Sequence, residues 1–147
     1  MAPAILLVVA TLIFRGLGAL GVAAFATWVD SARVALAMMF LFTAAAHFNK
    51  MKEDLIRMIP PSFPNPREIV FATGVLEILG AIGLLVPPAR RLAALGLALM
   101  LLVLFPANVS AARRSLTLRG KPVTPLTLRL PIQLLFLAFC LWVAFAG

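Results

Sequence analysis

Five long apolar stretches, separated by polar connections, dominate the pattern of hydrophobic and polar positions along the chain. They cover about residues 3–28, 32–48, 69–86, 92–109 and 126–145. A helix of about 20 apolar residues, rising about 1.5 Å per residue, crosses the hydrocarbon core of a bilayer. The pattern therefore predicts an all-α, polytopic membrane helix bundle that forms one membrane domain over residues 1–147.

The first apolar stretch is longer than one crossing needs, and Arg15 interrupts it near the middle, followed by three glycines. It lacks the basic start of a signal peptide, so we expect a retained span that tilts or kinks. Arg15 either reaches water along the helix or faces the bundle. Asp30 or Ser31 is expected to cap the next helix.

The connection after the second stretch has its own helical pattern. Met51, Leu55, Met58 and Ile59 recur at helical spacing, and charged residues fill most positions between them. This pattern predicts a short amphipathic helix over about 51–59 that lies in the membrane interface. Two prolines directly after it end the helix.

A single acid, Glu77, stands near the midpoint of the third stretch. An ionised carboxylate at that depth costs at least about 2.5 kcal/mol, so Glu77 is expected to be neutral, paired or in a polar cavity. Gly74, Ala81 and Leu84 share its helix face, and small residues let another helix come close. The sequence therefore predicts that Glu77 faces the bundle rather than lipid.

Other polar residues lie in or at the ends of the apolar stretches. Together with Glu77 they form the predicted ligand-binding or polar pocket: Arg15, His47, Asn108, Arg129 and Gln133. Because Arg15 and Glu77 have similar predicted depths, we hypothesise that they pair directly or through water. The alternative is that these groups only hold helices together by hydrogen bonds worth about 0.6 kcal/mol each.

Composition supports the membrane assignment and charge adds a topology. Apolar residues make up 63% of the chain, charged residues only 12%, and the net charge is +8. The basic residues lie between spans, so anionic lipid headgroups rather than nucleic acid are the expected partner. Nine basic residues flank the long connections and three lie at the other side, which predicts a cytoplasmic N-terminus and an external C-terminus. Trp28 and Trp142 then share the outer interface.

The sequence excludes several kinds of site. With one cysteine, Cys140, and one histidine, a single chain can form no disulfide, redox cysteine pair, two-histidine haem site or zinc site. No phosphate-binding loop or nucleophile motif is present. We therefore expect no metal and no cofactor held by the chain itself, with a quinone or lipid as the candidate ligand. The oligomeric state is left open.

Several short motifs, in order, carry a family resemblance. They are His47-Phe48, Met58-Ile59-Pro60-Pro61, Thr73-Gly74-Val75-Leu76-Glu77, Phe105-Pro106-Ala107-Asn108 and Arg129-Leu130-Pro131-Ile132-Gln133. This pattern, over roughly residues 33–145, resembles the DoxX family of small integral membrane proteins. The resemblance implies a four-helix membrane core, to which the stretch 3–28 adds a fifth helix.

The resemblance also implies a functional setting. One DoxX branch is named for a subunit of a thiosulfate:quinone oxidoreductase, others are linked to redox-stress complexes, and a distant animal branch assists assembly of receptor channels. We therefore predict a subunit of a redox or quinone-linked system in a bacterial plasma membrane, not catalytic alone, that binds a lipophile and has a membrane or redox protein partner. The alternatives are a non-enzymatic assembly protein and a small lipid-binding or transport protein.

Overall fold

The computed structural model describes residues 1–147, and it is almost entirely helical. Six α-helices carry the fold, and two 3₁₀ turns, η1 (Ala23–Phe25) and η2 (Pro87–Ala89), join neighbouring helices. Two very short strands form a hairpin before the last helix: β1 (Thr117–Leu118) and β2 (Lys121–Pro122). The helices are α1 (Ala2–Ala19), α2 (Trp28–Phe48), α3 (Lys52–Met58), α4 (Pro66–Leu85), α5 (Arg90–Arg113) and α6 (Leu126–Ala146).

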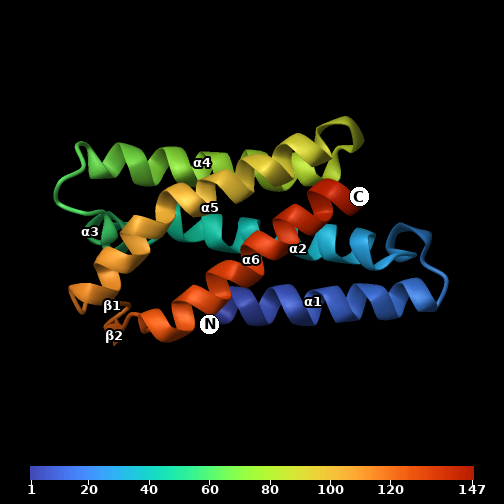
Figure 1. The fold of residues 1–147 in the computed structure, drawn as a ribbon, viewed down its shortest axis with the longest axis horizontal. Helices are drawn as coiled ribbons and strands as arrows, with labels where there is room; N and C mark the ends of the chain where they lie inside the picture. Colours follow the sequence, from blue (N-terminus) through green and yellow to red (C-terminus); the bar gives the residue numbers. More distant parts are fainter.

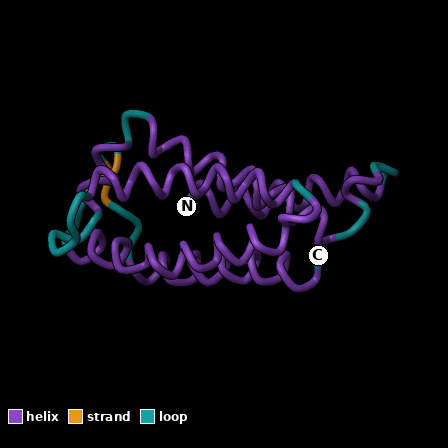
Figure 2. The backbone as a smooth tube through the Cα atoms, turned by 90° about the horizontal axis from the view of Figure 1, so that it is seen from above, coloured by secondary structure: helices purple, strands orange, loops and turns teal.

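The five long helices run along one axis and form a bundle (Figure 1). Seen from above, the loops gather at the two ends of this bundle and the strands lie at one end (Figure 2). All five are long and apolar enough to cross a membrane, whereas α3 is short and lies at the end that carries the hairpin (Figure 1). The predicted all-α membrane bundle is confirmed, and the outer faces of its helices are expected to contact lipid.

Helix α2 is the centre of the bundle. It packs on α1, α4 and α6. Half of its apolar 18-residue segment is buried inside the protein, whereas the corresponding segments of the other four long helices are 17–28% buried. Its buried face is built from small residues between larger ones, such as Ala35, Leu36, Met39 and Phe40. Alanines let neighbouring helices approach closely, while the larger side chains fill the space between them.

The first apolar stretch is not one long helix. Helix α1 ends at Ala19, and Gly21 follows with a φ of +102°, a left-handed conformation that glycine adopts most readily. The chain turns through η1 and re-enters the bundle at Trp28. The cap of α2 is Thr27, whose side chain accepts the backbone N–H of Asp30 at 3.0 Å. The predicted capping by Asp30 or Ser31 is therefore wrong.

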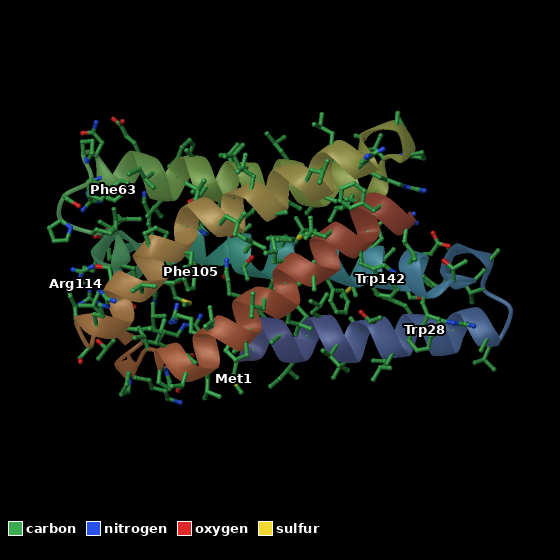
Figure 3. All side chains as sticks on the ribbon, in the orientation of Figure 1. Met1, Trp28, Phe63, Phe105, Arg114 and Trp142 are labelled. Carbon is green, nitrogen blue, oxygen red and sulfur yellow. The ribbon has the colours of Figure 1, made fainter.

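Helix α3 is held against the hairpin, not isolated from the fold. Met58 is buried with Ala111 and Val123 in a small apolar cluster at this end of the molecule. Arg114, labelled at the same end in Figure 3, donates from Nη2 to the carbonyls of residues 57, 58 and 59 at 2.7, 3.1 and 3.3 Å. These bonds satisfy carbonyls that the end of a helix leaves without partners.

The hairpin is tied to α3 by one carboxylate. Arg119 and Gly120 form its two-residue turn, both with positive φ, as a primed turn requires. The backbone N–H of Arg119 donates to Oδ2 of Asp54 at 3.0 Å, and Arg57 pairs with the other oxygen. These contacts, that of the Arg119 N–H first, hold the pKa of Asp54 below its usual value.

Candidate functional site

The closest approach of two helices in the site occurs at Gly74. A Cβ added there would lie 2.6 Å from Cβ of His47 and 2.9 Å from ring atoms of Phe48. Only glycine fits between α4 and the last turn of α2 at this point. Gly74 is eight residues from the start of α4, roughly 12 Å at about 1.5 Å per residue. His47, in the last turn of α2, therefore lies well inside the bundle.

One turn along the same face, Glu77 points into the α2–α4 interface. Its side chain is 9% exposed. Thr43 of α2 lies with Oγ1 3.0 Å from Oε2 of Glu77 and 3.0 Å from the carbonyl oxygen of Phe40. The other carboxyl oxygen, Oε1, lies 3.7 Å from Nε2 of His47. The prediction that Glu77 faces the bundle is confirmed, as are the buried positions of Gly74, Ala81 and Leu84.

His47 is oriented by α4. Its Nδ1 lies 2.7 Å from the carbonyl oxygen of Val70, and its side chain is 11% exposed. Thr73 lies with Oγ1 3.2 Å from the same Nδ1 and within 3.0 Å of the carbonyls of residues 69 and 70. The imidazole is thus held with Nε2 towards Glu77. We call the four side chains Thr43, His47, Thr73 and Glu77 the α2–α4 polar cluster.

A second group of polar residues joins α5 to α6. Nη1 of Arg129 donates to Oδ1 of Asn108 at 2.6 Å, and Nε donates to the carbonyl of Thr124 at 3.2 Å. Gln133 is buried and donates from Nε2 to the carbonyl of Leu101 at 2.7 Å. That carbonyl is next to the one whose helical partner Pro106 removes, so Gln133 supports α5 where the proline weakens its hydrogen bonding. No hydrogen bond connects this group to the α2–α4 polar cluster.

The predicted pairing of Arg15 with Glu77 is wrong. The guanidinium of Arg15 lies over the ring of Trp28, 5.6 Å from its centroid. Figure 3 labels Trp28 near Trp142, at the end of the bundle away from Arg114. The predicted depth of Arg15 in the membrane is wrong because α1 ends at Ala19. Arg15 therefore lies one turn from the end of the helix rather than near its middle. The six predicted pocket residues therefore fall into three places.

Sequence reasoning missed the two threonines of the α2–α4 polar cluster. Thr43 precedes His47 by four residues and Thr73 precedes Glu77 by four, so each pair shares a helix face. The sequence could have indicated both threonines, because each lies four residues before either the only histidine or the only mid-span acid. Both are half-buried, at the edge of the cluster.

The cluster offers hydrogen-bonding and proton-accepting groups, and no set of metal ligands. Nowhere do three or more histidine, cysteine or acidic residues come together. Cys140, the single thiol of the chain, is buried in the main apolar core. The carboxyl and the imidazole of the cluster can form hydrogen bonds and can accept or release protons.

Comparison with known proteins places the polar residues within one family domain. No curated protein and no solved structure gives a match. A family model described as domain of unknown function DUF8561 matches residues 36–144, and no match to DoxX is found. The matched segment contains the α2–α4 polar cluster and the α5–α6 group, and leaves out α1 and Arg15. Because it covers most of the sequence, the chain belongs to the DUF8561 family.

Proposed function

We propose that this membrane protein binds a quinone or similar lipophile at the α2–α4 polar cluster, as the membrane subunit of a redox system. It has no catalytic centre of its own and works with a membrane or redox protein partner. The observation that carries the proposal is the carboxyl of Glu77 beside the imidazole of His47, both buried between apolar helices. The DoxX-like motifs that contain both residues favour the redox setting.

Helix association alone is a poor explanation for this cluster. A hydrogen bond between membrane helices contributes about 0.6 kcal/mol, while an ionised carboxyl at mid-membrane costs at least about 2.5 kcal/mol. Gln133 of α6, which donates to the carbonyl of Leu101 on α5, supplies such a bond without an acid. A carboxyl and an imidazole side by side add the ability to accept and release a proton, which quinone chemistry needs.

The cluster also has the composition of a site for an amphipathic ring. Polar groups that fix orientation are few, and the surrounding residues of α2 and α4 are apolar. The flanking side chains Phe48 and Phe71 are about half exposed and stack edge to face with ring centroids 5.9 Å apart. A lipophile that enters from the bilayer meets these rings beside the polar cluster.

Binding of a short-chain ubiquinone or menaquinone to the full chain in nanodiscs tests the proposal. We expect saturable binding, measured by equilibrium dialysis with extraction of the bound quinone. Glu77→Leu should weaken it at least about tenfold, because a buried ligand group loses its hydrogen-bond partner. The matched control is Glu68→Leu, which removes an exposed acid from the first turn of the same helix and should leave binding unchanged.

Absence of saturable binding, or equal loss in both variants, would refute the proposal. Crosslinking of the unaltered chain in native membranes then separates the alternatives. A membrane protein captured without a bound lipophile would favour an assembly role.

We further propose that the end carrying α3 and the hairpin faces the cytoplasm of a bacterial cell. Most basic residues of the chain belong to this end, and Trp28 and Trp142 share the other end (Figure 3). In a Cys140→Ala background, Ser62→Cys should resist a membrane-impermeant maleimide added to intact spheroplasts. Ala26→Cys should react. The reverse labelling would overturn this orientation.

A further inference from the structure

The hydrogen positions of the α2–α4 polar cluster follow from its partners. The carbonyl oxygen of Val70, 2.7 Å from Nδ1 of His47, can only accept. Nδ1 therefore carries the hydrogen, and Nε2 of a neutral imidazole presents a lone pair.

The gap between Nε2 of His47 and Oε1 of Glu77 contains no shared proton. The two atoms are 3.7 Å apart, whereas charge-assisted N–H···O bonds are about 2.7–2.9 Å long. An imidazolium paired with a carboxylate would close this distance. A neutral histidine leaves two acceptor atoms, one from α2 and one from α4, facing the same space.

Thr43 completes the hydrogen-bonding pattern. Its single hydroxyl hydrogen has two acceptors in reach, the carbonyl oxygen of Phe40 and Oε2 of Glu77, both at 3.0 Å. A hydrogen on Oε2 resolves the conflict, because Glu77 then donates to Thr43 and Thr43 donates to Phe40. Every hydrogen is used, no charge is buried, and Oε1 is left as a carbonyl-type acceptor.

We infer that the α2–α4 polar cluster prefers the reduced, hydroxyl-bearing form of its ligand, a hydroquinone, over the oxidised quinone. This inference rests on the proposed function. A ring hydroxyl donates into the space between Nε2 of His47 and Oε1 of Glu77, which both lack a donor. A quinone carbonyl brings lone pairs towards lone pairs and leaves three acceptors without a hydrogen. The two side chains keep 11% and 9% of their surface exposed.

The size of the preference follows from one hydrogen bond. One buried hydrogen bond raises the affinity of a ligand about tenfold. An acceptor buried without a donor lowers the affinity of the quinone further, which increases the difference between the two redox forms. We therefore expect the hydroquinone to bind about tenfold more tightly than the quinone.

The test measures dissociation constants for both redox forms with the full chain in nanodiscs. A short-chain ubiquinone is kept oxidised in air or reduced by dithionite under argon, and the bound fraction is quantified after extraction. The informative variant is Glu77→Gln, with Glu68→Gln as control. In Glu77→Gln the new side-chain amide offers N–H donors to the gap while its oxygen faces Thr43, so the preference should fall towards equality or reverse.

The outcomes separate this inference from the proposed function. Equal or tighter binding of the oxidised form by the unaltered chain overturns the inference but keeps the quinone site. An unchanged preference in Glu77→Gln also overturns it. If neither redox form binds, the proposed function fails and the inference fails with it.

Discussion

Adding one methyl group at Gly74 should separate α2 from α4 and disable the polar cluster. In Gly74→Ala the new Cβ would lie 2.6 Å from Cβ of His47, so a shift of about 1 Å is needed to restore van der Waals contact. Neither atom is the end of a flexible side chain. That shift is enough to break the 3.0 Å contact between Thr43 and Glu77.

The magnitude is a balance of two terms. Overpacking a core costs about 1–3 kcal/mol, while replacing glycine by alanine inside a helix returns at most about 1 kcal/mol. Because the two terms oppose each other, we expect a net loss of up to roughly 2 kcal/mol for Gly74→Ala. Gly96→Ala isolates the helical term, because a Cβ at Gly96 meets no atom within 4 Å, so that variant should be unchanged or slightly more stable.

The chain contains its own reporter for this measurement. Cys140 is the single cysteine and is fully buried, so a thiol-reactive dye labels it only when the bundle opens. The thermal midpoint of dye labelling should fall by several degrees in Gly74→Ala and not in Gly96→Ala. Equal midpoints, or quinone binding in Gly74→Ala equal to that of the unaltered chain, would refute the close approach as the basis of the site.

Three further predictions concern the ends and the second polar group. Asp54 has a lowered folded pKa, so its contribution to the α3–hairpin contact is complete above the usual carboxyl pKa and is lost as pH falls through the lowered value. On acidification, the exchange rate of the Arg119 N–H should therefore rise relative to the intrinsic exchange rate of an unprotected amide at the same pH. Asp54→Asn should abolish this pH-dependent loss of protection. Gln133→Leu leaves the carbonyl of Leu101 without its 2.7 Å donor and should lower stability by about 1–3 kcal/mol, read from the dye midpoint; an unchanged midpoint would contradict this. Arg114→Gln removes three carbonyl contacts and should increase hydrogen exchange in residues 52–59 while leaving the spans unaffected; equal exchange throughout would show that the contacts do not stabilise α3.

The buried face of α4 could be predicted from the sequence because it depends on local spacing alone. Gly74, Glu77, Ala81 and Leu84 repeat at helical intervals within an apolar run, and all four are buried. An acid in such a run has only one low-energy direction, towards other protein groups.

The partners of Glu77 could not be predicted, because they depend on how far each helix slides and rotates against its neighbours. Arg15 was predicted as a partner because its position in the first apolar stretch implied the same membrane depth as Glu77. Because α1 ends at Ala19, the side chain of Arg15 lies over Trp28 instead. Asn108 and Arg129 were predicted in one pocket with Glu77, and they bond to each other instead. The hairpin was missed because two-residue strands are too short to show an alternating pattern.

The central position of α2 has a consequence for how the protein is made. Thr43 and His47 leave the ribosome before their partners in α4, which follow 23 to 34 residues later. A nascent α2 alone in lipid would expose the hydroxyl of Thr43 and the imidazole of His47, and α1 supplies no hydrogen-bond partner for either group. We therefore expect α2 to stay at the insertion machinery until α4 has been synthesised, so that the two helices enter the bilayer packed together. Helices α5 and α6 then assemble on this pair.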